Sequence, residues 1–209
     1  IQDEYLKERI RENGIVKLAD IPVIRDGISV WQGDITRLAA DAIVNAANSQ
    51  MLGCFIPMHR CIDNCIHTFA GVQLRAECKR QMNRLRERYG RDYEQPTAVP
   101  MLTDAYNLPA KKVVHIVGPI VRYELTPKLE QNLADCYRNT LNMCVDHNLV
   151  SVAFCCISTG VFHFPNKRAA EIAVQTVSKW MREHPGCMER VVFNVFQDED
   201  KKYYEELVR

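Results

Sequence analysis

Two cysteines and a histidine crowd one short segment of this sequence. Cys54, His59 and Cys61 lie within eight residues of one another. Two thiols and one imidazole form a compact ligand set for a borderline divalent metal, with zinc as the usual occupant. Three protein ligands leave one position open, as in zinc sites that carry out catalysis. The segment therefore predicts a zinc site, unless these are unligated side chains in a cysteine-rich chain.

Cys65 complicates this ligand count. It follows Cys61 by four residues, so the two side chains lie on the same helix face if the segment is helical. A fourth ligand would close the site and make the metal structural. His67 is a weaker competitor, because its spacing points it away from Cys61.

Polar residues surround the same segment. Asn45, Asn48, Asp63 and Asn64 flank it on both sides. Asn48 and Asp63 could hydrogen-bond the hydroxyl groups of a sugar. The alternative is that these side chains form turns and cap helices, which Asn and Asp commonly do.

A carboxylate follows an expected strand at Gly33-Asp34-Ile35-Thr36. Ligands of open α/β sheets bind at the carboxyl ends of the strands. Asp34 could there accept a hydrogen bond from an exocyclic amine such as that of adenine. Alternatively, Asp34 or Thr36 caps the next helix.

A second candidate binding loop runs from Ser158 to Phe162, between an apolar run and a helix. Its small residues and glycine would let backbone N–H groups approach a phosphate, and the following helix adds partial positive charge. Phe162 could lie against a sugar. The alternative is a strand-to-helix connection with a buried aromatic plug.

Hydrophobic periodicity predicts the helices and strands that must position these residues. Strands are expected at 28–31, 42–46, 97–103, 113–117, 150–157 and 190–196. Helices are expected at 1–13, 61–89 with a break near Gly71, from Pro127 to about Cys144, 166–183 and 198–208. Thr126 should cap the helix that begins at Pro127. Strands that alternate with helices favour a largely parallel sheet covered on both faces.

Composition limits the class of protein. A chain of 209 residues suits one domain with an extension. The net charge of +1 does not indicate a nucleic-acid-binding face, and the basic residues of 79–91 are most simply a solvated helix surface. Nine cysteines, an odd number, suggest reduced thiols in a cytoplasmic protein. No apolar run approaches the roughly 20 residues that cross a bilayer.

Four segments together resemble the macrodomain family: Val30–Thr36, Asp41–Asn48, Ile62–His67 and Ile157–Phe162. The resemblance implies a macrodomain-type three-layer α/β/α sandwich at 28–209, with a mixed, largely parallel sheet and an N-terminal helical extension at 1–27. It also implies ADP-ribose binding, with Asn48 and Asp63 as catalytic residues at the distal ribose. The residues that it implies for ADP-ribose binding are Asp34, Ile35, Asn48, Ser158, Thr159, Gly160, Val161 and Phe162.

One departure from the common family pattern is informative. Many hydrolytic macrodomains have a glycine run where this chain has Cys54, His59 and Cys61. This substitution resembles the zinc-dependent branch of bacteria and fungi, whose bacterial members are associated with a lipoylated carrier protein. We expect Cys65 to stay outside the zinc site. His163 is a second departure, since glycine is common there; it would either narrow the phosphate loop or contact the ligand.

The resemblance implies a protein-ADP-ribose hydrolase that removes mono-ADP-ribose from modified proteins. Zinc beside the distal ribose would polarise a ribose hydroxyl or deliver a bound water to the anomeric carbon. The main alternative is a non-catalytic ADP-ribose reader with a structural zinc. A second alternative is a metal-dependent hydrolase of another nucleotide, although a diphosphatase would need a cluster of acidic magnesium ligands that the sequence lacks. Neither nucleic acid nor a membrane is an expected partner.

Overall fold

The computed structural model describes all residues from Ile1 to Arg209. Its main sheet has six strands in the order β2-β8-β7-β4-β6-β5. All neighbouring strands are parallel except the edge pair β5 and β6. The strands are β2 (Ile28–Gln32), β4 (Ala42–Ala47), β5 (Met101–Asp104), β6 (Lys112–Val117), β7 (Ser151–Phe154) and β8 (Arg190–Val195).

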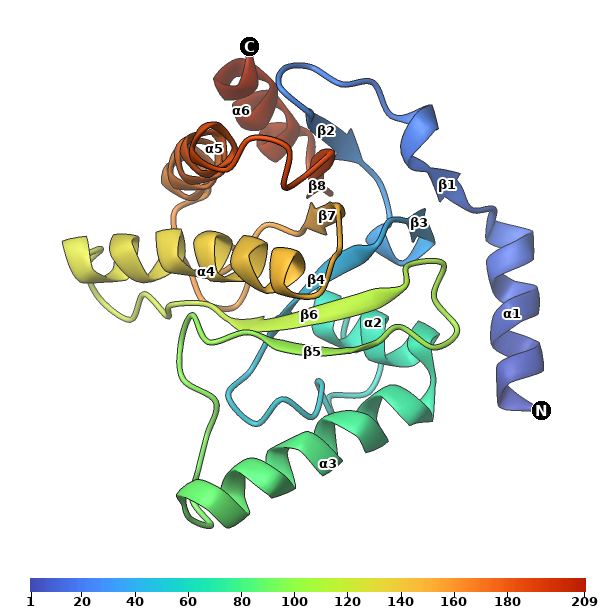
Figure 1. Cartoon of the computed structure of the whole chain (residues 1–209). Coiled ribbons are helices and arrows are strands. Elements are labelled where there is room, and N and C mark those ends of the chain that lie inside the picture. The colour runs from blue at the N-terminus through green and yellow to red at the C-terminus, as the bar shows by residue number, and fades with distance from the viewer.

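Helices cover both faces of this sheet. On one face lie α4 (Pro127–Asp146), α5 (Asn166–Glu183) and α6 (Asp198–Val208), which pack on one another; on the other face lie α2 (Ile62–Ala70) and α3 (Val72–Tyr89) (Figure 1). The interior strands are mostly apolar because both of their faces are buried, and the few polar side chains within them, such as Asn45 and His115, are hydrogen-bonded. This arrangement confirms the predicted three-layer α/β/α sandwich with a mixed, largely parallel sheet.

Local chemistry explains where several elements begin. Thr126 caps α4 by accepting a hydrogen bond from the Leu129 N–H at 3.3 Å, and Pro127 takes the first helical position. Asp41, at the start of β4, ties that strand to the start of β7. Its Oδ2 accepts from the backbone N–H groups of Val150 and Ser151 and from the Ser151 hydroxyl, at 2.9–3.1 Å.

The N-terminal segment packs beside the sandwich as an added helix, α1 (Gln2–Asn13), which ends at Gly14 (Figure 1). Asp3 accepts hydrogen bonds from the side chains of Gln73 and Asn107, and Leu6 is buried. A two-residue strand, β1 (Val16–Lys17), then pairs with β3 (Leu38–Ala39). None of the helices combines the length and the hydropathy that a membrane-spanning segment needs.

The structure differs from the sequence-based expectation at two strands and one pairing. The strand expected from Thr97 begins only at Met101, because residues 97–100 form a turn in which Ala98 has φ +64°. The strand expected at 150–157 ends at Phe154, and the apolar residues beyond it are buried in a loop instead. The β1–β3 pairing was not expected, since two-residue strands carry no periodicity.

Candidate metal and ligand site

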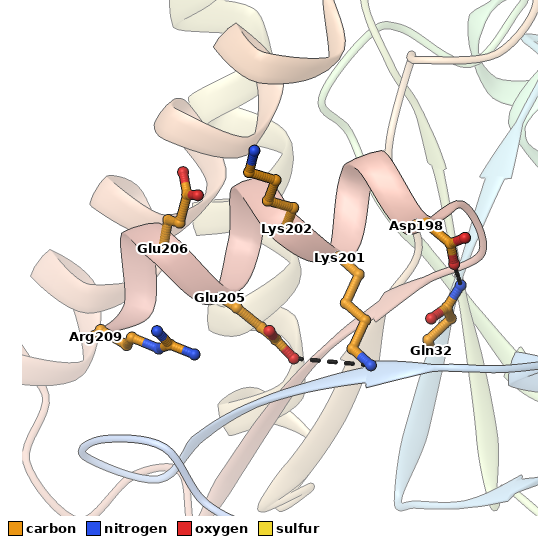
Figure 2. Close-up of a pocket in the computed structure, with 7 residues that line it drawn as sticks. All are labelled: Gln32, Asp198, Lys201, Lys202, Glu205, Glu206 and Arg209. Atoms are coloured by element: carbon orange, nitrogen blue, oxygen red, sulfur yellow. Dashed lines mark hydrogen bonds and ion pairs between the residues drawn. The ribbon is translucent and has the colours of Figure 1, made fainter.

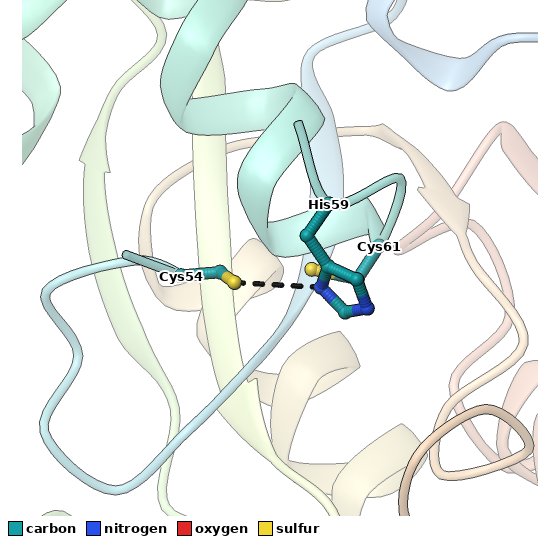
Figure 3. Close-up of side chains that lie close together, drawn as sticks. All are labelled: Cys54, His59 and Cys61. Carbon is teal, nitrogen blue, oxygen red and sulfur yellow. Dashed lines mark hydrogen bonds between the residues drawn. The ribbon is translucent and has the colours of Figure 1, made fainter. Parts of the chain in front are cut away.

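The loop between β4 and α2 holds the three predicted metal ligands. Cys54, His59 and Cys61 turn toward one another, with donor atoms that all lie within 4.8 Å (Figure 3). Cys54 Sγ is 3.4 Å from His59 Nδ1. Gly53 allows the loop to fold this closely onto α2: its φ is +82°, and a Cβ there would lie 2.8 Å from the His67 ring.

The first turn of α2 supports this cluster. Asn64 donates through its side chain to the carbonyl oxygens of Cys54 and Ile56, at 3.2 and 3.0 Å. Cys61 is the N-cap of α2, and its Sγ accepts from the Asn64 N–H at 3.4 Å. Burial raises the pKa of the Cys61 thiol to about 11 despite this N–H contact. Both the backbone and one sulfur of the cluster are therefore held by the start of a helix.

The donor set fits a zinc ion chemically. Two thiols and one imidazole converge, and no fourth sulfur or nitrogen joins them. Cys65 lies outside the cluster, one turn further along α2. Burial raises its pKa, as does the nearby charge of Asp34. The geometry thus offers three protein ligands rather than four.

Asn48 and Asp63 meet behind this loop. Asn48 Nδ2 donates to Asp63 Oδ2 at 3.3 Å, and Asn45 Nδ2 donates to Asp63 Oδ1 at 2.7 Å. Asp63 is buried, and burial raises the pKa of its carboxyl. Asn48 also accepts from the Gln50 N–H at 3.0 Å, so it forms a turn as well. The two asparagines hold both oxygens of one carboxylate in a fixed orientation.

A buried hydrogen-bond network continues inward from Asn45, and no spacing of residues in the sequence predicts it. Asn45 Nδ2 donates to His115 Nδ1 at 3.0 Å, which leaves the Nε2–H of His115 to donate to Thr103 at 3.0 Å. Burial lowers the pKa of His115 to about 3 and that of His67 to about 4, so both rings are neutral. His67 and Cys78 lie close to His115. The hydrogen bonds of His115 indicate core polar packing rather than a second metal centre.

Asp34 caps a short helix, which was the alternative to a ligand-binding role for this residue. Its Oδ1 accepts from the Thr36 N–H at 2.9 Å and from the Thr36 hydroxyl at 2.6 Å, at the start of the short helix η2 (Ile35–Arg37). Its Oδ2 has no protein partner. The α2 helix packs against η2, which places Asp34 near Cys65. One carboxylate oxygen of Asp34 therefore remains free of protein hydrogen bonds.

Phe196 is a candidate binding residue that the sequence reading missed. It directly follows β8 and is 80% exposed. The neighbouring pairing of β2 and β8 brings it beside Gly33, whose N–H donates to the Val195 carbonyl at 3.1 Å. The available signal was an aromatic residue at the carboxyl end of a buried strand, where open α/β sheets bind ligands.

The Ser158–Phe162 loop follows β7 and lies against the loop that follows β6. The Val121 N–H donates to the Phe162 carbonyl at 2.9 Å, and a Cβ at Gly118 would lie 2.1 Å from Ser158 Oγ. Ser158 has φ +67°, a left-handed conformation that exposes successive backbone N–H groups. Around Gly160 a Cβ would meet nothing within 4 Å. This loop thus has open space in front of its backbone.

His163 adopts φ +57° and is exposed. This backbone conformation explains why glycine suits the position, since glycine reaches it without steric cost. The side chain makes no hydrogen bond to the rest of the protein. Its conformation belongs to the turn that closes the loop, where the His163 N–H donates to the Gly160 carbonyl at 3.0 Å.

A surface hollow of about 430 Å³ lies along α6, away from the metal loop (Figure 2). Its lining is wholly polar or charged, and two contacts are internal to it: Gln32 donates to Asp198 at 2.7 Å, and Lys201 pairs with Glu205 at 4.0 Å. Ligand pockets are mostly apolar with a few placed polar groups. The hollow therefore has the character of solvated surface.

Comparisons with known proteins agree with this geometry. The macro domain family matches residues 44–173. A protein-ADP-ribose hydrolase of Treponema medium is 50% identical, over 100% of this chain and 78% of that protein. A protein-ADP-ribose hydrolase of Staphylococcus aureus is 47% identical, over 99% of this chain and 75% of that protein.

Solved structures similar to this chain are also macrodomains. The crystal structure of a Trypanosoma brucei macrodomain in complex with ADP has a TM-score of 0.79 and 32% identity, over 94% of this chain and 77% of that one. A substituted Oceanobacillus iheyensis macrodomain with ADPR has a TM-score of 0.78 and 34% identity, over 90% of this chain and 95% of that one.

Proposed function

This chain belongs to the macro domain family, and from that membership we propose that it is a zinc-dependent protein-ADP-ribose hydrolase. It binds ADP-ribose and removes mono-ADP-ribose from modified proteins. Relatives at 47–50% identity bear the name protein-ADP-ribose hydrolase, and a Trypanosoma brucei macrodomain has been solved with ADP-ribose. One observation carries the zinc-dependent part: Cys54, His59 and Cys61 converge in the loop that also holds Asn48.

We assign ADP-ribose to the carboxyl edge of the sheet within residues 28–209, with residues 1–27 as an extension. Asp34 Oδ2, which has no protein partner, accepts from the exocyclic amine of adenine beside Ile35. Phe196 offers an exposed ring face on which the adenine stacks. The backbone of Ser158, Thr159, Gly160, Val161 and Phe162 receives the diphosphate.

Asn48 and Asp63 position the distal ribose in this proposal. Asn45 and Asn48 each hold one oxygen of Asp63, so the carboxylate is oriented before the substrate arrives. The remaining acceptor capacity of those oxygens is available to ribose hydroxyls. Cys54, His59 and Cys61 would hold zinc beside that ribose, where the ion supplies Lewis-acid polarisation of a ribose oxygen or of a water.

The deciding experiment compares release of ADP-ribose from a mono-ADP-ribosylated protein with binding of free ADP-ribose, in wild type and in His59→Ala. A lipoylated carrier protein is one substrate to include. We expect release to be abolished while most of the ADP-ribose affinity survives, since adenine and diphosphate are held by other elements. Cys65→Ala is the matched control, because this thiol lies outside the donor cluster.

A circular-dichroism melt of His59→Ala separates loss of chemistry from loss of folding. Unfolding of this variant would make the zinc structural. A folded variant that cleaves at the wild-type rate would remove zinc from the chemistry. Binding of ADP-ribose by wild type without any release would favour the non-catalytic reader.

A further inference from the structure

The α3 helix leaves its positive charge unpaired. It carries six basic side chains and two acidic ones, and none of the six forms a salt bridge. By contrast, α1, α5 and α6 each have at least one basic side chain in a salt bridge: Arg9 pairs with Glu12, Arg168 with Glu130, and Lys201 with Glu205. A helix surface with uncompensated charge of one sign attracts a partner of the opposite sign.

Three of these cations form a stripe along one side of α3. Arg75, Lys79 and Arg86 recur at helical spacing, which puts them on one face. Two of the three contact the loop between β4 and α2. The Arg75 guanidinium lies 4.4 Å from the centre of the Phe55 ring, and Arg86 donates to Gln50 Oε1 at 2.9 Å. The two ends of the stripe are therefore anchored on this loop.

The tip of the metal loop is apolar and exposed. Phe55, Ile56 and Met58 are 65%, 61% and 93% exposed. Met58 also has φ +58°, a conformation that glycine or asparagine would adopt more readily. Nothing in the fold requires a large apolar side chain there. Apolar side chains and arginines at the edge of a site are typical of a protein-binding surface.

We propose that this tip and the cationic stripe of α3 together bind the polypeptide that flanks the modified residue of the substrate protein. The proposal rests on the hydrolase function proposed above. In that proposed function the bond to be cleaved lies beside the metal loop, so the polypeptide attached at that bond leaves the site close to the loop tip, where Arg75 of α3 lies over Phe55. The complementary partner is a segment with acidic side chains and at least one apolar side chain.

A nucleic-acid partner fits this surface less well. Tyr89, the exposed aromatic of α3, already stacks on Tyr93 with ring centres 5.3 Å apart, and the Arg88 guanidinium lies 5.1 Å from its centre. It is therefore occupied rather than available to stack on a base. The apolar loop tip also has no role in phosphate binding.

The test uses two synthetic peptides that carry ADP-ribose through the same linkage. One has Asp and Glu with a Leu around the modified residue, and the other has Lys in place of the acids. We expect wild type to show a KM about tenfold lower for the acidic peptide at low salt, with similar kcat, and the difference to shrink as salt is added.

The double variant Lys79→Glu/Arg86→Glu should raise the KM for the acidic peptide by about tenfold and lower it for the Lys peptide. Its dissociation constant for free ADP-ribose should not change. The matched control, Arg182→Glu/Lys202→Glu, makes the same charge change on exposed cations of α5 and α6 and should leave the peptide preference intact. Met58→Ser should weaken both peptides equally, because it removes the shared apolar contact.

Equal effects of the α3 and control variants on both peptides would overturn the proposal. So would an unchanged preference in a folded α3 variant, or stronger competition by single-stranded RNA than by an unmodified acidic peptide. If wild type cleaves neither peptide, the proposed hydrolase function fails. The dissociation constants of the two peptides then still decide whether the acidic one is preferred through Lys79 and Arg86.

Discussion

The Asp34 carboxylate caps η2, and in the proposed function it also binds adenine. Its Oδ1 is used by Thr36, at 2.9 Å from the N–H and 2.6 Å from the hydroxyl, while its Oδ2 is free. Asp34→Ala removes both oxygens. Asp34→Asn keeps an acceptor on Thr36 and places an NH₂ group where Oδ2 was. The pair of variants therefore separates the cap from the proposed adenine contact.

The expected magnitudes follow from these contacts. Loss of an N-cap costs about 1 kcal/mol, which lowers the Tm of a chain of this size by about 2–4 °C. Asp34→Ala should show this loss, whereas Asp34→Asn should melt near wild type. Both should weaken ADP-ribose by about 1–3 kcal/mol, since each leaves the adenine amine without its acceptor.

Calorimetry with ADP-ribose, a thermal melt and a zinc measurement on each protein complete the test. Zinc content should stay at the wild-type level, because Asp34 lies outside the donor cluster. An Asp34→Asn protein that binds ADP-ribose with wild-type affinity would refute the assignment. Asp34 would then be a helix cap alone.

Three further outcomes are expected. Elemental analysis of protein made with zinc present should find about one zinc per chain; Cys61→Ala should lower that content and Cys65→Ala should not, and equal loss in both would contradict a three-ligand site. Gly160→Ala should leave the Tm unchanged, because the added methyl meets open space, yet weaken ADP-ribose in calorimetry; unchanged affinity would place the diphosphate elsewhere. Asp41→Ala should cost about 1–3 kcal/mol in urea unfolding, because it leaves two backbone N–H groups of the β7 region without an acceptor. Lys111→Ala, which removes only the exposed partner of Asp41, should cost less than about 1 kcal/mol.

The elements that sequence periodicity predicts well are those with local signals at both ends. The helices at 166–183 and 198–208 match the structure to the residue. Their amphipathic spacing and the residues that flank them act within a few positions of the chain. The predicted strand ends at 97–100 and 155–157 were wrong. An apolar composition indicates that residues are buried, and residues in a loop can be buried as well as residues in a strand.

The candidate donor cluster of Cys54, His59 and Cys61 could be predicted because all three residues lie in one short segment. The buried hydrogen-bond network of Asn45, His115 and Thr103 could not be predicted, because it joins side chains from β4, β6 and β5. These strands neighbour one another only through the order of the sheet. Phe196 was missed for a similar reason, because its place beside Gly33 depends on the pairing of β8 with β2.

The sequence by itself determined the donor set, the helices and the α/β class, because these depend on residue types and spacings within about twenty positions. Tertiary structure decided which oxygen of Asp34 remains free, that Cys65 lies outside the donor cluster, and that Asn48 meets Asp63. The physical reason is that a side chain's hydrogen-bond partners and burial are set by neighbours that strand order and helix packing bring together, and no local pattern encodes those neighbours.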